Sequence, residues 1–347
     1  MKVGALQRAS EKGPRFTRRG GLAATASVLF LLGLVLGWAG AVGLAEQETA
    51  EAPAPPMRVA KADGGGEDAG RDTEPAPSST PEPATAGDGR GKSPPAPLER
   101  YASPTPDAAL DAPRVAIVID DLGLNRARSE RAIALDSAVT LAFLTYADGL
   151  AKFARQARSA GHELIVHVPM QPHDSSWDTG RNTLRANLPS AERARRLNWA
   201  LQRFDGFIGV NNHMGSAFTE NRGAMRDLLQ SLRDRGLMFL DSRTTAKTVA
   251  PSLAAEIGLP FASRDVFLDN DKDAAAIRRN LDKTVRIARE TGQAIAIGHP
   301  YPVTLEVLAD WVPKARAQGV ALVPLSAVIQ RSGLARNQTA AKPDDKD

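Results

Sequence analysis

The sequence predicts an α/β fold, a single barrel of seven or eight strand–helix units between residues 113 and 333. Short apolar runs alternate with amphipathic segments over about 220 residues, a pattern typical of a parallel sheet covered by helices. Glycines follow several amphipathic segments, where a helix end needs a left-handed residue. They are Gly161, Gly236, Gly258, Gly292 and Gly319. Seven or eight such units favour a closed or nearly closed barrel over an open sheet.

Each expected element has its own signature. Strands are predicted at short runs rich in β-branched and apolar residues: 115–119, 139–144, 163–168, 207–210, 237–240, 259–262, 294–297 and 321–325. Helices are predicted where apolar residues recur on one face, as they do between Ser190 and Leu201. These segments are 125–134, 150–159, 190–204, 221–235, 248–257, 273–290 and 305–318.

The N-terminus predicts a membrane segment. Residues 1–20 are basic and precede an uncharged stretch, 21–45, which is slightly longer than the roughly 20 apolar residues that span a bilayer. Basic residues on the amino-terminal side orient residues 1–20 to the cytoplasm. We therefore expect an inner-membrane anchor with the domain in the periplasm, if the source is a Gram-negative bacterium. A cleaved signal is the alternative, because Gly43-Leu-Ala45 resembles a cleavage site.

Residues 46–112 are dense in Pro, Ala, Gly, Ser and Asp and poor in large apolar residues. Such a segment buries too little surface to offset its ordering entropy. It is predicted to be a disordered linker between membrane and barrel. The tail, residues 334–347, has a similar composition and is also predicted to be disordered.

Composition excludes several classes of protein. The chain has no cysteine, so it has no disulfides, and any metal ligands must be His, Asp, Glu or water. The formal charge is +4, but no basic cluster is interleaved with aromatic residues, so we expect no nucleic-acid binding.

Polar residues stand at the ends of several predicted strands. Asp120 and Asp121 follow the first strand, and three of the five histidines, His167, His213 and His299, stand near the ends of later ones. Residues that follow the strands of a parallel barrel converge on one face, where such folds place their chemistry. The five side chains are therefore expected to meet.

A divalent metal explains this set of residues. A zinc-type site takes about three nitrogen or oxygen ligands and leaves a position for water, and Asp121, His167 and His213 are predicted to supply them. The metal would lower the pKa of that water and polarise a carbonyl. Asp120 would act as base, and His299 would protonate the leaving group.

Structural roles stay open as alternatives. An Asp pair after a strand is also typical of a helix cap or loop, and a histidine at a strand end is often a hydrogen-bonded core residue. Asp241 and Arg243 either orient the site residues or form an ordinary surface ion pair.

At these positions the chain resembles the polysaccharide deacetylase superfamily, most closely its divergent branch, over about residues 114–332. Three segments are similar to superfamily motifs: Val118-Ile-Asp-Asp121, Gly161-His-Glu-Leu-Ile-Val-His167 and Ala296-Ile-Gly-His299. Three more resemble blocks of the divergent branch: Asn211-Asn-His-Met-Gly-Ser216, Asp241-Ser-Arg-Thr244 and Val266-Phe-Leu-Asp-Asn270. The resemblance implies a deacetylase-like barrel with Asp120 as base, His299 as acid and a metal on Asp121 and His167.

The chain departs from the superfamily pattern in two places. A second metal-binding histidine is expected four positions after the first, but that position is Gln171, and His173 lies two residues further on. The Arg-x-Pro-x-Gly block that shapes the family's acetate site is not apparent. We expect His213 to replace the missing ligand.

The leading functional hypothesis is a metal-dependent hydrolase of the cell envelope that removes acetyl groups from a cell-wall or other envelope polysaccharide. One alternative is a catalytically degenerate glycan- or protein-binding module on the same fold, motivated by Gln171. Another is a metal hydrolase that acts on a non-sugar amide or ester.

Overall fold

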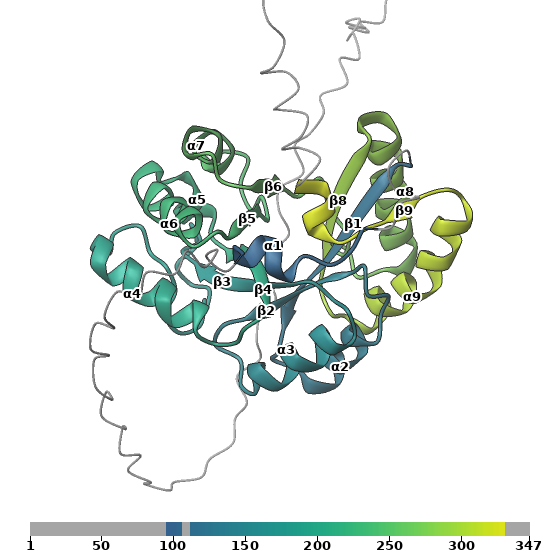
Figure 1. Cartoon of the computed structure of the whole chain (residues 1–347), viewed down its shortest axis with the longest axis horizontal. Helices are drawn as coiled ribbons and strands as arrows, with labels where there is room; N and C mark the ends of the chain where they lie inside the picture. Colours follow the sequence, from purple (N-terminus) through teal and green to yellow (C-terminus); the bar gives the residue numbers. More distant parts are fainter. Residues whose placement is uncertain (1–94, 106–111, 330–347) are drawn as a thin grey trace, which may run out of the picture. The chain divides into compact units, whose positions relative to one another are not determined.

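The computed structural model describes residues 95–105 and 112–329, and its centre is a parallel sheet (Figure 1). Within these residues the sheet has nine strands: β1 Arg114–Leu122, β2 Thr140–Leu144, β3 Leu164–Met170, β4 Phe207–Met214, β5 Met238–Asp241, β6 Phe261–Ser263, β7 Val266–Phe267, β8 Gln293–Gly298 and β9 Ala321–Leu322. Their hydrogen-bonded order is β6-β5-β4-β3-β2-β1-β8-β7, and β9 pairs with β1. Every pairing is parallel.

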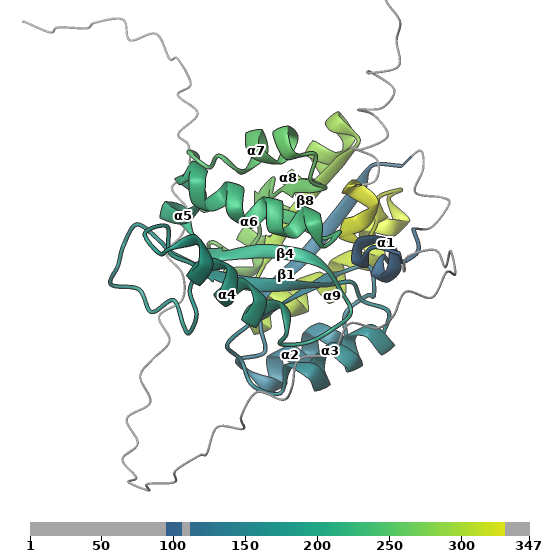
Figure 2. The same ribbon diagram turned by 60° about the vertical axis from the view of Figure 1, so that its left-hand side comes forward.

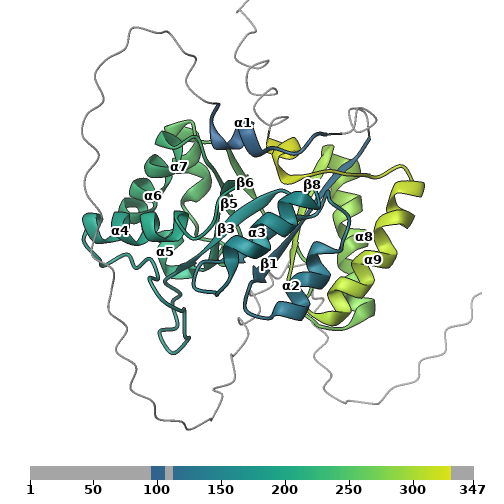
Figure 3. The same ribbon diagram turned by 60° about the horizontal axis from the view of Figure 1, so that its bottom comes forward.

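Helices connect the strands and cover the outside of the sheet. The described residues form α1 Pro97–Tyr101, α2 Arg126–Ile133, α3 Leu150–Ser159, α4 Ser190–Leu201, α5 Ser216–Glu220, α6 Arg222–Asp234, α7 Ala250–Ile257, α8 Ala274–Thr291 and α9 Pro302–Ala317. Helices α4 and α6 lie side by side in Figure 2, and α8 and α9 lie side by side in Figures 1 and 3. The seven predicted helices are all present, with ends shifted by at most a few residues.

The two ends of the strand order meet at one short link. Strands β6 and β7 lie at opposite ends of the sheet path, yet only Arg264 and Asp265 separate them, a connection that spans at most about 11 Å. The Arg264 N–H donates to Asp241 O on one side (3.0 Å), and the Asp265 N–H donates to Ile295 O on the other (2.9 Å). The sheet must therefore curve round on itself, which confirms the predicted single α/β barrel.

Side chains of β1 alternate between two apolar clusters. Val115, Ile117 and Ile119 belong to the cluster between the sheet and the helices, whereas Ala116 and Val118 belong to a second cluster inside the barrel. This alternation is the ordinary two-residue period of a strand. Burial on both faces explains why the strand has a continuous apolar sequence.

Helix α1 corrects the predicted extent of the disordered linker. It lies within the segment 46–112, yet Leu98 and Tyr101 pack against the cluster inside the barrel, and the Leu98 N–H donates to Gly236 O. The Ser103 N–H donates to the buried carboxylate of Glu163 at 2.8 Å. The prediction of disorder is therefore wrong for residues 95–105, because two apolar side chains were enough to dock this short piece.

Other predictions on the termini lie outside the described residues. They are the basic segment 1–20, the membrane segment 21–45, most of the linker and the tail 334–347. In the part of the chain that the structure describes, no helix is long and apolar enough to cross a membrane.

Gly209 in β4 is expected to tolerate no side chain. A Cβ at this position would lie 2.5 Å from the backbone oxygen of Met238 in β5, so Gly209→Ala must push the two strands apart. We expect it to lower the free energy of unfolding by about 1–3 kcal/mol, measured by urea denaturation. The matched control is Gly223→Ala in α6, where the nearest atom to a new Cβ is 3.6 Å away. A similar loss in both variants would contradict this account.

Candidate functional site

The five predicted site residues line one cavity of about 310 Å³ at the carboxyl ends of the strands. Asp120 and Asp121 come from β1, His167 from β3 and His213 from β4, while His299 directly follows β8. Aromatic side chains also line the cavity, namely Trp177, Phe267 and Tyr301. The expected convergence at one face of the barrel is therefore observed.

An irregularity in β1 brings both carboxylates to this cavity. Successive side chains of a strand point to opposite faces, so Asp120 and Asp121 would ordinarily diverge. Asp121 has a left-handed backbone, with φ of 58°, which is uncommon for a residue with a side chain. The pairing of β1 with β2 also shifts register between Ile119 and Leu122. This local bulge re-aims the side chains, as bulges beside active sites often do.

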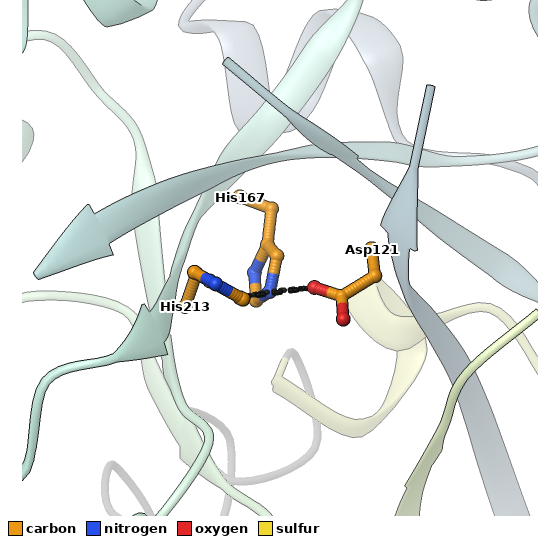
Figure 4. A group of neighbouring side chains, drawn as sticks. All are labelled: Asp121, His167 and His213. Atoms are coloured by element: carbon orange, nitrogen blue, oxygen red, sulfur yellow. Dashed lines mark hydrogen bonds and ion pairs between the residues drawn. The ribbon is translucent and has the colours of Figure 1, made fainter. Parts of the chain in front are cut away.

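Asp121, His167 and His213 point toward one another (Figure 4). Asp121 Oδ1 lies 3.3 Å from His167 Nε2 and 2.9 Å from His213 Nδ1, and the two histidine nitrogens are 3.3 Å apart. Donor atoms of a tetrahedral zinc with bonds of about 2.0–2.2 Å lie roughly 3.3–3.6 Å from each other. The three donors therefore fit around one divalent cation with only small movements.

The carboxylate of Asp121 supports this fit. Its Oδ1 is buried and lies within ion-pair distance of both histidines, yet it accepts no hydrogen bond of good geometry from any described residue. A bound cation would satisfy this oxygen. Burial by itself would raise the pKa of Asp121, but the neighbouring His213 and His167 outweigh it and hold that pKa well below its ordinary value. Asp121 is thus an ionised ligand candidate.

Asn211 connects the metal-ligand candidates to Asp120. Its Oδ1 accepts a hydrogen bond from His167 Nδ1 (2.8 Å), and its Nδ2 donates to Asp120 Oδ1 (2.8 Å). The first bond holds the proton of His167 on Nδ1 and leaves Nε2 available as a ligand. Sequence reasoning noted Asn211 only as part of a motif, because nothing local shows which side chains it bridges.

The pKa of the second carboxylate, Asp120, is shifted in the opposite direction from that of Asp121. Burial raises its pKa above the ordinary value, and the nearby charge of Asp121 adds to this, although His167 and His299 act in the opposite sense. Its Oδ2 lies 3.7 Å from His167 Nε2. A buried carboxylate with a raised pKa at the edge of a metal site is suited to accept a proton.

His299 is oriented by a carboxylate that the sequence analysis did not assign to the site. Asp269 Oδ1 accepts a hydrogen bond from His299 Nδ1 at 2.9 Å, and Asp269 Oδ2 accepts from the Thr304 hydroxyl at 2.8 Å. His299 Nε2 is 3.8 Å from Asp121 Oδ2, on the side of the cavity. Burial would lower the pKa of His299, but Asp269 outweighs it and raises that pKa to about 9. The imidazole is therefore protonated at neutral pH.

The sequence placed Asp269 in the block Val266-Phe-Leu-Asp-Asn270 but did not show which side chain it contacts. Asp269 follows β7, a strand of two residues that is too short to predict from an apolar pattern.

Tyr146 packs against the metal-ligand candidate His213. The two rings meet edge to face with centroids 6.4 Å apart. Gly180 packs so closely against the ring of Tyr146 that a Cβ at position 180 would lie 2.5 Å from it. The loop that follows β3 thereby supports His213 through Tyr146.

Gln171, which stands where the superfamily pattern has a second histidine, lies outside the metal-ligand cluster. Gln171 Oε1 accepts the Ala186 N–H at 2.9 Å and so anchors the loop that follows β3. His173 lies at the rim of the cavity, where it pairs with Glu220 at 3.2 Å. His213 is the second histidine beside Asp121, as expected from the sequence.

Asp241 has neither of the two roles considered for it. Its Oδ1 accepts the Arg243 N–H and its Oδ2 accepts the Thr248 hydroxyl, both at 2.8 Å. The side chain is buried and organises its own loop, and Arg243 is exposed. The correction has a simple cause: the backbone turns after β5 and presents its own N–H to the carboxylate.

Comparisons with known proteins place the barrel among relatives. A model of divergent polysaccharide deacetylases matches residues 117–329. The chain is 37% identical over 208 residues to the uncharacterized protein YibQ of Escherichia coli K12, which covers 59% of this chain and 65% of YibQ. It is 36% identical over 195 residues to an uncharacterized protein of Haemophilus influenzae Rd, covering 56% of this chain and 69% of the relative.

A solved structure has a similar fold. The crystal structure of the uncharacterized protein ATU2773 from Agrobacterium tumefaciens C58 superposes with a TM-score of 0.66 at 32% identity, and the match covers 67% of this chain and 95% of that one. The family match begins within β1 and extends to the last described residue, so it contains every residue of the site. The chain therefore belongs to the divergent polysaccharide deacetylase family.

Proposed function

We propose that this protein is a metal-dependent hydrolase that removes acetyl groups from a polysaccharide of the cell envelope. The observation that carries the proposal is the arrangement of one cavity: three donor atoms converge at its base, with a buried carboxylate and a protonated histidine beside them. Membership of the family supports a carbohydrate substrate. The apolar segment 21–45 supports the envelope location.

The ligand candidates suit a divalent metal, and the ion proposed here is zinc. One carboxylate oxygen and two imidazole nitrogens form a three-ligand set that leaves a further position open. When bound, such a cation polarises the acyl carbonyl and lowers the pKa of a water molecule in the open position.

The protein's own groups divide the proton transfers. Asp120 is placed to take a proton from the attacking water, and its hydrogen bond from Asn211 fixes the direction of its carboxylate. His299 carries a proton on Nε2 that it can donate to the departing amine or alkoxide. Asp269 holds the other ring nitrogen and stabilises the charged imidazole.

A glycan- or protein-binding module without activity is the second candidate, and Gln171 favours it because the superfamily pattern has a metal-binding histidine at that position. The position of His213 beside Asp121 supports the hydrolase instead, because His213 is placed where it could serve as the second histidine ligand. Metal content and acetate release separate the two candidates.

We expect the purified protein to bind about one divalent ion per chain, measured by elemental analysis after exposure to Zn²⁺. His167→Ala and His213→Ala should each lose most of this metal, because each removes one of three ligands. His173→Ala is the matched control, since His173 lines the same cavity but pairs with Glu220. A wild-type protein that binds no metal, or a control that loses it equally, would refute the proposed site.

Asp120→Asn should abolish most acetate release from N-acetylglucosamine oligomers or peptidoglycan, lowering kcat by about 10²–10⁴-fold. The substitution keeps the shape of the side chain and an oxygen for the Asn211 hydrogen bond, but it cannot accept a proton. Asp148→Asn is the control, because Asp148 is exposed and does not line the cavity. Full activity in Asp120→Asn would exclude Asp120 as the base.

Asp269→Asn should move the alkaline limb of the pH–rate profile to lower pH. Removing the negative charge beside Nδ1 destabilises the imidazolium, so His299 loses its proton at a lower pH, by about 1–3 units. Thr304→Val, which removes only a hydrogen bond to Asp269, should move the limb less. An unchanged alkaline limb in Asp269→Asn would show that His299 is not the acid.

A further inference from the structure

Two aromatic rings flank His299, and a cationic side chain lies over each ring. The ring of Phe267 meets His299 at 5.3 Å, and the guanidinium of Arg264 lies 5.0 Å from the centre of the Phe267 ring. On the other ring, Tyr301, the centroid is 5.7 Å from His299, and Lys272 Nζ lies 4.3 Å above it. All five side chains line the cavity.

Neither cation forms a direct ion pair with a carboxylate among the described residues. Arg264 donates from Nε to Ser242 O at 2.8 Å and from Nη2 to Arg243 O at 2.9 Å. These carbonyls hold the guanidinium in place. The charges of Asp120, Asp241 and Asp265 also act on it, but burial and the neighbouring Arg243 outweigh them and lower the pKa of Arg264. In the part of the chain that the structure describes, Lys272 forms no ion pair, and its ammonium group lies over the Tyr301 ring. A half-buried guanidinium without a direct counter-ion is costly, and an anionic ligand would remove this cost.

The acidic residues of the cavity have other direct partners. Asp120 accepts a hydrogen bond from Asn211. Asp269 is occupied by His299 and Thr304, and Asp121 faces the two histidines of the metal-ligand cluster. Asp174 is exposed on the loop that follows β3 and accepts the Ser176 N–H. Asp273, next to Lys272, caps α8 through its side chain. Arg264 and Lys272 are therefore the two cationic groups of this wall that have no direct carboxylate partner among the described residues.

We propose that Arg264 and Lys272 bind a carboxylate on the sugar from which the acetyl group is removed, so that the preferred substrate is an acidic glycan. This inference rests on the proposed function. The acyl carbon would lie at the metal-ligand cluster and the leaving atom at His299 Nε2, so the sugar ring itself must lie beside His299. Groups on either side of His299 then contact substituents of that sugar. A fixed guanidinium suits a carboxylate because it offers parallel N–H donors.

A pair of matched substrates tests this directly. Peptide-free glycan strands of peptidoglycan carry a lactyl carboxylate on alternate amino sugars, and chemical reduction converts these carboxylates to alcohols without changing the acetyl groups. For the metal-loaded full chain we expect kcat/KM to be about tenfold higher on the carboxylate strands, as charge-assisted hydrogen bonds would produce. The ratio of kcat/KM on the carboxylate strands to kcat/KM on the reduced strands should fall at least about threefold in Lys272→Gln, because one of the two cations is lost. Lys283→Gln, on α8 and away from the cavity, should keep the wild-type ratio.

Binding separates failure of this inference from failure of the proposed reaction. Dissociation constants of both strands for the Asp120→Asn variant, measured by calorimetry, report recognition without turnover. Tighter binding of the carboxylate strands, weakened by addition of Lys272→Gln, would support the inference even if no acetate were ever released. Equal binding of the two strands, or a preference that Lys272→Gln leaves intact, would overturn it whether or not the protein is a deacetylase.

Discussion

The left-handed backbone of Asp121 is the feature on which the rest of the site depends. A regular strand would send two adjacent carboxylates to opposite faces, and only one of them would enter the cavity. With the bulge at the end of β1, Asp121 lies between His167 and His213, while Asp120 lies against Asn211. Such a conformation is strained, and strained residues persist where the surrounding structure holds them in place. Here the ion pairs of Asp121 and the hydrogen bonds of its neighbours do so.

The same local geometry gives two chemically identical side chains different properties. The pKa of Asp121 is held well below the ordinary value by two imidazoles, whereas the pKa of Asp120 is raised by burial and by the charge of Asp121. Pairs of titratable groups whose environments move their pKa values apart are typical of acid–base sites. His299 is the third titratable group of the site, and Asp269 keeps it protonated in the pH range where a carboxylate is ionised.

The link that closes the barrel also builds the wall of the cavity. Arg264 and Asp265 join β6 to β7 and so connect the two ends of the sheet. Arg264 then extends into the cavity over Phe267, and the chain continues through β7 to Asp269. Closure of the fold, orientation of His299 and the Arg264 side of the cavity wall therefore all come from residues 264–269. A change in this short segment would affect all three together.

The sequence by itself determined the barrel and most of the site. Alternating apolar runs and amphipathic segments were sufficient for the fold, because their periods are set by backbone geometry. Strand ends located Asp120, Asp121, His167, His213 and His299, because parallel strands in a barrel end on one face. The sequence could not indicate that Asn211 bridges His167 and Asp120, that Asp269 is the partner of His299, or that Arg264 lines the cavity. Those roles depend on side-chain contacts between segments that are 22 to 91 residues apart. Only the packed barrel, with its register and its bulge, decides which of these side chains meet.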